Sequence, residues 1–269
     1  MAQNLQLTQF LNKVVLITGA AGGIGRAVAR ALLETGAIVC LGDVNTDGCE
    51  ETVQPYLEKN KSAKHLIYAL DVTNASSVKG FVDIVVATFG RIDCAFNNAG
   101  ILSGSKPLAD VDEIEYDKVV DIDMKGIFLC LKYEIPAMIN TGDKGVIVNT
   151  SSTLGIVGDK LSAAYIAAKH GVVGLTRAAA MDYADQNIRV NALAPGLTQT
   201  AMTEHWLADP KYQGPLLSNI PMKRPAMPEE MVGMTLFLLS DASSYITGHV
   251  MTVDGGMTMQ LKSKLRSEY

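Results

Sequence analysis

Short apolar runs alternate with segments of helical spacing along nearly the whole chain of 269 residues. The apolar runs lie at residues 14–18, 38–42, 65–70, 92–97, 146–149, 188–193 and 250–253. They have the length of strands and show little alternation of polar with apolar side chains, which indicates burial on both faces. Buried strands that alternate with helices form parallel sheets covered on both sides, with right-handed crossovers. The sequence therefore predicts a doubly wound α/β fold with about seven parallel strands and helices on both faces.

No linker or internal repeat divides the chain, so we expect a single domain over residues 1–269. The spacing of apolar residues predicts helices at about 23–34, 75–89, 111–138, 162–183 and 228–240. A further, polar helix is expected after the second apolar run and ends at about residue 59. The segment 198–220 interrupts this alternation and contains two prolines and Trp206. Because long insertions in compact domains are often lids or binding loops, we expect this one to cover a substrate. A packed surface excursion is the alternative.

The composition excludes several classes of protein. Hydrophobic residues make up 48% of the chain and charged residues 19%, and the net charge is -5, with no basic cluster that could follow nucleic-acid phosphates. The apolar runs are far shorter than the roughly 20 residues that span a bilayer. Residues 1–11 contain no Lys or Arg and no long apolar stretch, unlike a secretion signal. We therefore expect a cytoplasmic protein that binds neither nucleic acid nor membrane.

The cysteines and histidines give no sign of a metal site. Four cysteines and four histidines are scattered through the chain without the spacing of metal ligands or paired disulfides. Most of the cysteines fall in apolar segments, which is typical of buried free thiols. We predict no bound metal.

A glycine-rich turn follows the first strand, with the pattern T-G-x-x-x-G-x-G over residues 18–25. A helix N-terminus has unpaired backbone N–H groups and partial positive charge, and a pyrophosphate approaches it closely where no Cβ intervenes. The turn therefore predicts dinucleotide binding by Gly19, Gly23, Ile24 and Gly25, as in a Rossmann-type fold. The strict G-x-G-x-x-G fingerprint does not match, and a tight turn without a ligand is the alternative.

Asp43 ends the second apolar run, 24 residues after Gly19. A carboxylate at this position can accept hydrogen bonds from both adenosine ribose hydroxyls and would repel a 2′-phosphate. Neither Gly22 nor Val44 supplies a cation for such a phosphate. We therefore predict NAD rather than NADP as the cofactor, with a simple strand-end cap as the other interpretation of Asp43.

Tyr165 and Lys169 are four residues apart on an expected helix, so both project from one face of it. A phenol with a pKa near 10 is a poor base at neutral pH, and a neighbouring ammonium favours the phenolate. Ser152 follows the fifth expected strand, at the sheet edge where such folds bind ligands. Ser152 could hold a substrate oxygen while Tyr165 exchanges its proton and a hydride moves to or from nicotinamide. Each residue alone also has an ordinary structural interpretation.

Taken together, these motifs resemble the short-chain dehydrogenase/reductase family in its short, single-domain form, over about residues 12–257. The resemblance implies that Asp71 and its neighbour Val72 lie at the adenine. It also implies that the segment from Asn97 to Gly100 lies along the cofactor. The further cofactor-binding residues implied in this way are Asn98, Ala99, Gly100, Pro195, Gly196, Leu197 and Thr200, together with Tyr165 and Lys169. Family members are commonly homotetramers joined through two long helices, here about 111–138 and 162–183.

One position departs from the family pattern. Asp123 stands where the family usually has the Asn of a catalytic tetrad with Ser, Tyr and Lys. The family residue acts mainly through its backbone carbonyl, which Asp retains, but Asp adds a negative charge near Lys169. We expect activity to survive with a shifted pH optimum.

The substrate is expected to be a hydrophobic secondary alcohol or ketone, and cyclic, aromatic and steroid-like compounds are the candidates. Met202 and Trp206 make the 198–220 segment apolar, and Leu154 follows Ser152 closely, so an apolar pocket would surround one polar catalytic corner. A β-ketoacyl-carrier-protein reductase is one alternative, disfavoured by Asp43 and the net charge of -5. A catalytically idle NAD-binding regulator is the other, disfavoured by the intact Ser152, Tyr165 and Lys169.

Overall fold

The computed structural model describes residues 9–61, 63–142 and 144–259. All seven strands of this part of the chain lie in one sheet with the order β3-β2-β1-β4-β5-β6-β7, and every pair is parallel. Most of the N-terminal segment that carries the expectation about localisation lies outside the described residues. The prediction of a doubly wound α/β sheet is confirmed.

The strands are short and mostly buried. Their bounds are β1 Val14–Thr18, β2 Ile38–Asp43, β3 His65–Ala69, β4 Cys94–Asn97, β5 Gly145–Thr150, β6 Ile188–Pro195 and β7 Val250–Val253. Every residue of β1, β4 and β5 is buried, whereas the edge strands β3 and β7 are partly exposed. Continuous apolar runs therefore mark the centre of the sheet, as expected for parallel strands covered on both faces.

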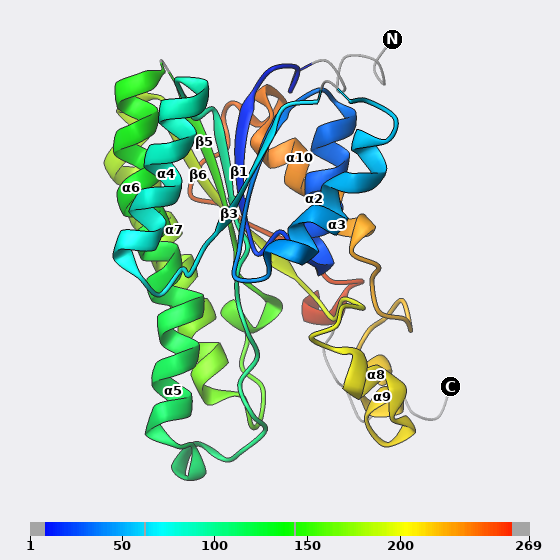
Figure 1. The fold of residues 1–269 in the computed structure, drawn as a ribbon. Coiled ribbons are helices and arrows are strands. Elements are labelled where there is room, and N and C mark those ends of the chain that lie inside the picture. The colour runs from blue at the N-terminus through cyan, green and yellow to red at the C-terminus, as the bar shows by residue number, and fades with distance from the viewer. Residues whose placement is uncertain (1–8, 62, 143, 260–269) are drawn as a thin grey trace.

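Helices cover the sheet in two layers (Figure 1). One layer contains α2 Gly23–Glu34, α3 Thr46–Leu57 and α10 Glu229–Leu239, and the other contains α4 Ala75–Phe89, α6 Gly126–Thr141 and α7 Ala163–Tyr183. Each layer packs on its own hydrophobic cluster, with Leu32 and Phe96 in one and Phe81 and Met138 in the other. Full burial of such side chains contributes about 1.5–3 kcal/mol each.

The long helix expected at 111–138 is not continuous. It begins as α5 Glu113–Val120, with the Asp112 carboxylate accepting a hydrogen bond from the Ile114 amide, and passes through a π-helical turn, Asp121–Lys125, into α6. A π turn inserts one extra residue, which changes the direction of the side chains along it and often marks a functional site. Asp123, on this turn, is fully buried. Periodicity alone predicts the length of this region but not the irregular turn.

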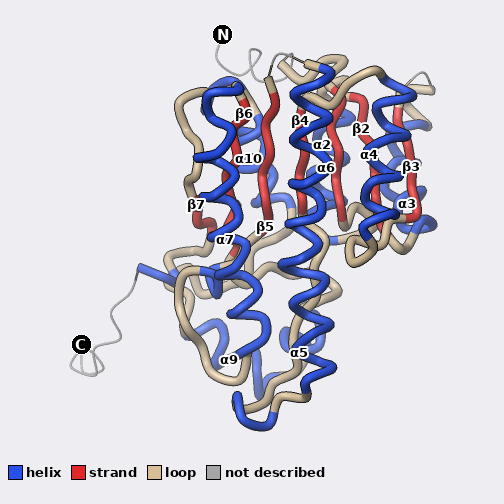
Figure 2. Tube along the Cα trace, turned by 90° about the vertical axis from the view of Figure 1, so that its left-hand side faces the viewer, coloured by secondary structure: helices blue, strands red, loops and turns tan. Residues whose placement is uncertain are grey.

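The 198–220 segment forms two short helices, α8 Glu204–Ala208 and α9 Pro210–Ser218, beyond the carboxyl ends of the strands (Figures 1 and 2). It is anchored at its start, where Leu197 accepts a hydrogen bond from the Ala226 amide at 2.9 Å. The segment is therefore partly helical, and its role in covering a substrate stays a prediction.

The strand order reverses between β1 and β4, which pair side by side at the centre of the sheet. Chain leaving β1 turns towards β2, and chain leaving β4 turns towards β5. This divergence opens a crevice at the carboxyl ends of the strands, which is where doubly wound folds bind ligands. Within the described residues, no helix is both long and apolar enough to cross a membrane.

Candidate active site

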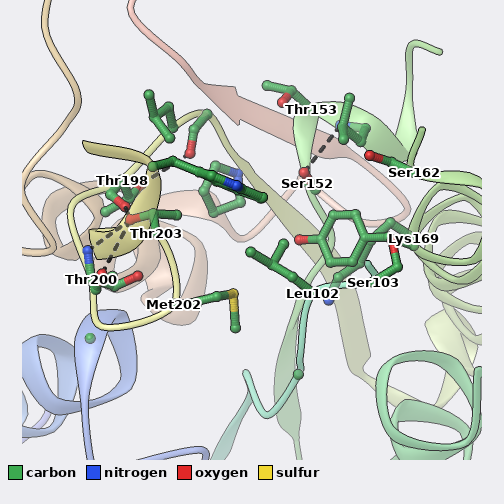
Figure 3. Close-up of a pocket in the computed structure, with 18 of the residues that line it drawn as sticks. Leu102, Ser103, Ser152, Thr153, Ser162, Lys169, Thr198, Thr200, Met202 and Thr203 are labelled. Carbon is green, nitrogen blue, oxygen red and sulfur yellow. Dashed lines mark hydrogen bonds between the residues drawn. The ribbon is translucent and has the colours of Figure 1, made fainter. Parts of the chain in front are cut away.

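A cavity of about 750 Å³ lies at the carboxyl ends of β1, β4, β5 and β6. Figure 3 shows it with Ser152 and Lys169 on one side and the 198–203 turn on the other. Glycines and residues with apolar or hydroxyl side chains make up most of its wall, and its charged residues are Asp43, Asp123, Asp159, Lys160, Lys169 and Lys211. This volume falls in the range that holds cofactors and drug-sized ligands.

The glycine-rich turn joins β1 to α2 in a conformation that needs glycine. Gly19 and Gly23 have φ of 66° and 51°, in the left-handed region, and a Cβ on Gly19 would lie 2.9 Å from the Ala99 Cα. A Cβ on Gly25 would collide with the Gly19 carbonyl. The N-cap residue of α2 is Gly22, which has no side chain that could accept a hydrogen bond from the first N–H groups of the helix. Gly22, Gly23 and Ile24 line the cavity, so these N–H groups are available to a ligand there. This cradle fits a pyrophosphate.

Asp43 lies at the end of β2 in the cavity wall. Its two carboxylate oxygens accept hydrogen bonds from the amides of Ala21 and Asn45, each at 3.0 Å. Each carboxylate oxygen has a second lone pair, so the group can still accept from a ribose hydroxyl. Arg26, a cation close to this turn, donates to the Glu51 carboxylate at 3.0 Å and to the Ala21 carbonyl, and it does not line the cavity.

The end of β4 is fastened to the glycine turn. The Thr18 hydroxyl accepts from the amides of Asn98 and Ala99 at 2.9 and 3.1 Å, and the Asn98 side chain donates to the Gly19 carbonyl at 3.2 Å. These bonds span about 80 residues of sequence and join the two strands at the switch point. They explain why the Asn98-Ala99-Gly100 motif accompanies a glycine turn.

Ser152, Tyr165 and Lys169 converge on the cavity as predicted. Ser152 ends the connection from β5, where its hydroxyl caps a short turn by accepting from the Leu154 amide at 3.1 Å. Tyr165 and Lys169 lie one turn apart on α7, and the Lys169 ammonium lies 5.5 Å from the centroid of the Tyr165 ring. Lys169 also donates to the Thr150 carbonyl at 3.1 Å. The three side chains come from two elements that the sheet edge brings together.

Burial and the neighbouring charges act in opposite directions on the pKa values of Tyr165 and Lys169. Burial raises the pKa of Tyr165, whereas the Lys169 charge lowers it, the Asp123 charge raises it, and a hydrogen bond with Ser152 lowers it; the net direction is upward. Burial lowers the pKa of Lys169, but the Asp123 and Tyr165 charges outweigh burial, so its pKa is raised. Lys169 therefore stays an ammonium at neutral pH and favours the Tyr165 phenolate.

Asp123 forms a buried ion pair with this lysine. Its Oδ2 lies 3.1 Å from Lys169 Nζ, and its Oδ1 accepts from the Ile101 amide at 2.8 Å. Burial raises the pKa of the Asp123 carboxyl, and the Lys169 charge opposes that rise. An Asn would keep the bond to Ile101 but not the charge. The structure thus places the negative charge of Asp123 beside Lys169, as expected from its position in the sequence.

The turn that follows β6 is braced by a threonine. The buried Thr203 hydroxyl donates to the Thr198 carbonyl at 2.6 Å and accepts from the Thr200 amide at 3.1 Å (Figure 3). Thr200 packs against the glycine turn, since a Cβ on Gly23 would lie 3.1 Å from the Thr200 methyl group. The turn therefore closes one side of the cavity.

Most residues predicted for the site line this cavity. They are Gly19, Gly23, Ile24, Asp43, Asn98, Ala99, Gly100, Asp123, Ser152, Leu154, Tyr165, Lys169, Pro195, Gly196, Leu197, Thr200, Met202 and Trp206. Gly25, Asp71 and Val72 do not line it: Gly25 supports the turn from behind, the Asp71 carboxylate accepts from Thr73, and Val72 packs near Gly126. Their predicted contacts with a cofactor stay predictions.

Among the wall residues not named from the sequence are two stretches, with Leu102, Ser103 and Ser105 in one and 159–162 in the other, and Lys211 and Tyr212 of α9. The two stretches are irregular loops without a motif, and tertiary structure alone brings them together. A buried chain of hydrogen bonds was also not predicted from the sequence. Asn97 donates to Glu134 and to Asn149, and Asn149 donates to Thr176. Polar residues inside apolar runs were the signal for this chain.

A phosphate cradle next to a Tyr–Lys pair and a serine hydroxyl defines a nicotinamide-dependent oxidoreductase. A protein-family model described as "Enoyl-(Acyl carrier protein) reductase" matches residues 19–258 of this chain. The chain belongs to the short-chain dehydrogenase/reductase family, whose members bind a nicotinamide dinucleotide, and it is an alcohol dehydrogenase/ketone reductase.

Similar proteins include enzymes that act on rings. A 2,5-dichloro-2,5-cyclohexadiene-1,4-diol dehydrogenase of Sphingobium indicum is 40% identical, over 94% of this chain and 99% of its own. The levodione reductase of Leifsonia aquatica is 39% identical over 93% of this chain and 96% of its own. A crystal structure of levodione reductase superposes with a TM-score of 0.90 and 39% identity, over 94% of this chain and 100% of the other. A 3-oxoacyl-[acyl-carrier-protein] reductase of Thermotoga maritima is 40% identical, over 92% and 98%.

Proposed function

We propose that this protein transfers a hydride between NAD(H) and a hydrophobic cyclic secondary alcohol or its ketone. The observation that carries the proposal is that Ser152, Tyr165 and Lys169 line one cavity together with two apolar side chains of the 198–220 segment, Met202 and Trp206. A small polar corner in an apolar pocket orients one oxygen and leaves the ring in contact with carbon. The dehydrogenase and reductase similar to this chain that are named for ring compounds support the same substrate class.

In this proposal, the Ser152 hydroxyl donates a hydrogen bond to the substrate oxygen, and Tyr165 Oη accepts the alcohol proton during oxidation. In ketone reduction the same phenol donates that proton. Lys169 stabilises the phenolate by charge, and Asp123 holds the lysine in place through the buried ion pair. When bound, the nicotinamide would supply the hydride acceptor or donor. The apolar wall excludes water from the reacting atoms.

NAD is proposed in preference to NADP. Two features support this preference: Asp43 places a negative charge in the cavity wall, and Arg26 donates a hydrogen bond to the Glu51 carboxylate. A 2′-phosphate next to Asp43 would meet a like charge in a site where the neighbouring cation is already paired. Initial rates with NADH and NADPH at equal, subsaturating concentrations test this preference, and a faster rate with NADPH would contradict it.

The substrate class is tested with a panel of alcohols of matched size. We expect turnover of cyclohexanol and of a cyclohexanediol, and little turnover of a linear polyol or of a sugar alcohol. A carrier-protein-linked β-ketoacyl reductase would instead prefer NADPH and an acyl thioester. Equal or better rates on the thioester would overturn the proposal in favour of that alternative.

We also propose that the protein is a cytoplasmic homotetramer of single-domain subunits with a small-molecule substrate and no nucleic-acid or membrane partner. Phe128 on α6 and Met181 on α7 are 45% and 81% exposed, although both are large and apolar. They lie on the two helices through which family members commonly associate, and burial of such side chains stabilises an interface. Light scattering coupled to size-exclusion chromatography tests the tetramer, and a monomer at assay concentration would contradict it.

A further inference from the structure

A second cavity of about 490 Å³ adjoins the active site. The loop of residues 101–106 separates the two, because Leu102, Ser103 and Ser105 line both cavities. Met202 and Trp206 line both as well. Figure 3 shows Leu102 and Met202 projecting into the space beside Ser152 and Lys169. The position of this loop therefore sets how much room the active site has on this side.

The loop is held at its two ends by hydrogen bonds that backbone amides donate. The Ile101 amide donates to Asp123 Oδ1 at 2.8 Å, and the Lys106 amide donates to the Leu161 carbonyl at 3.2 Å. Lys106 and Ser162 also form an isolated parallel bridge. A movement of the loop would thus reach residues 159–162, which form another part of the active-site wall.

Between these ends, one side chain ties the loop to the body of the protein. Glu115, in the first turn of α5, accepts a hydrogen bond from the Gly104 amide at 2.6 Å and another from Lys106 Nζ at 2.9 Å. A Cβ on Gly104 would lie 2.6 Å from Glu115 Oε1, so glycine permits the close approach of the carboxylate. The described residues show no other polar tie for residues 102–105. Both oxygens of one carboxylate therefore hold the middle of the loop and its far end.

The electrostatics keep this tie in place at neutral pH. Hydrogen bonds from Lys106 and from the Gly104 amide lower the pKa of Glu115, so the carboxylate is ionised. The exposed ion pair with Lys106 contributes little stability by itself, as surface pairs generally do. The bond from the Gly104 amide, at 2.6 Å, holds a residue that itself lines the second cavity.

We propose that Glu115 is a positioning residue for substrate size: it holds the 101–106 loop as the wall between the two cavities and so limits the alcohol that the active site accepts. This inference rests on the proposed function. Without the tie, the wall can retreat into the second cavity, and the site gains room for a bulkier ring. Room for about one extra methylene changes discrimination by roughly tenfold or more.

The test compares Glu115→Ala, Glu115→Gln and a control, Asp241→Ala. The control removes an exposed carboxylate that pairs with Lys144 at 2.8 Å, at the opposite edge of the sheet from the site. For each full-length protein, kcat and KM are measured for cyclohexanol and for a decahydronaphthol, along with the Kd of NADH by fluorescence. Amide hydrogen exchange reports the order of the loop independently of activity.

We expect Glu115→Ala to reduce the preference for cyclohexanol over decahydronaphthol by roughly tenfold, mainly through KM. Exchange of the residue 102–106 amides should accelerate, while the Kd of NADH stays within about twofold. Glu115→Gln retains an acceptor for the Gly104 amide and should rescue most of the preference, and Asp241→Ala should change neither quantity.

Unchanged preference together with unchanged exchange in Glu115→Ala would overturn the inference, and so would an equal effect from the control. Wild-type protein that binds NADH but turns over neither alcohol would instead overturn the proposed function. In that case the exchange of residues 102–106 still decides whether Glu115 holds the wall. A variant that loses NADH binding along with selectivity would show a general structural role and contradict the proposal.

Discussion

The buried carboxyl of Glu134 makes the stability of this protein depend on pH. Glu134 lies on α6 beneath the active site, is 1% exposed, and accepts a hydrogen bond from Asn97 Nδ2 at 2.9 Å. Burial raises the pKa of Glu134 from 4.5 to about 7, although the bond from Asn97 opposes that rise. The folded protein therefore holds a proton that the unfolded chain releases at lower pH.

The sign of the effect follows from this difference. Below about pH 4.5 the carboxyl is protonated in both states, and its contribution to stability is fully present. Between about pH 4.5 and 7 the unfolded chain ionises first, so the free energy of unfolding falls as pH rises. At 1.36 kcal/mol per pKa unit, the loss is complete above pH 7 and amounts to roughly 3 kcal/mol.

Glu134→Gln removes the titration while it keeps an oxygen that can accept from Asn97. Its amide can also donate to Asn97 Oδ1, which is buried and has no hydrogen-bond partner among the described residues. We expect the variant to be close to wild type near pH 5 and more stable by roughly 3 kcal/mol at pH 8. Urea unfolding followed by circular dichroism at four pH values, at one protein concentration, measures the difference.

Glu50→Gln is the matched control, because Glu50 is an exposed carboxylate on α3. It should follow the wild-type curve at every pH. A difference between Glu134→Gln and wild type that stays constant from pH 5 to pH 8 would refute the assignment of the pH dependence to Glu134.

Three further outcomes are expected. Tyr165→Phe should lower kcat by at least about a hundredfold, because the phenol moves a proton. The Kd of NADH should change by less than about twofold, because the ring still packs. Initial rates and fluorescence titration measure the two quantities, and retained turnover would exclude Tyr165 as the proton carrier. Asp123→Asn removes a charge that raises the pKa of Tyr165, so the acid limb of the pH profile of kcat/KM for alcohol oxidation should move to lower pH. Asp121→Asn, on the same turn but exposed, is the control and should leave that pH profile unchanged. Asp43→Asn should improve binding of NADPH relative to NADH by roughly tenfold, since a like charge is removed beside the 2′-phosphate; an unchanged ratio of the two Kd values would contradict the role of Asp43.

The sheet could be predicted from the sequence because its signal is local. Seven apolar runs of strand length correspond to seven observed strands, and the last, Val250–Val253, has the expected bounds. The π turn at Asp121–Lys125 could not be predicted, since a single inserted residue hardly disturbs the apolar pattern of a helix. Tertiary contacts with Lys169 and Ile101 show where this turn directs Asp123.

In the candidate site, too, some residues could be predicted from local sequence motifs, whereas others depend on tertiary contacts. Motif residues such as Tyr165 and Lys169 have a fixed spacing on one helix, and the sequence placed them correctly in the cavity wall. The role of Glu115 depends on its contact with Gly104, eleven residues away, across a segment whose regular structure is one short 3-10 helix, Leu108–Asp110. No periodicity encodes such a contact. The chain that joins Asn97, Asn149 and Glu134 likewise appears only when β4, β5 and α6 are packed together.

The most direct test of the account follows the hydride itself. Wild-type protein and Tyr165→Phe are incubated with NAD and cyclohexanol that carries deuterium on the carbinol carbon, and the reduced cofactor is analysed by mass spectrometry and NMR. The account predicts one deuterium per molecule of reduced cofactor, on one face of the nicotinamide C4, and almost no reduced cofactor from Tyr165→Phe. Deuterium recovered in water, or reduced cofactor formed equally well by the variant, would contradict direct hydride transfer with Tyr165 as the proton acceptor.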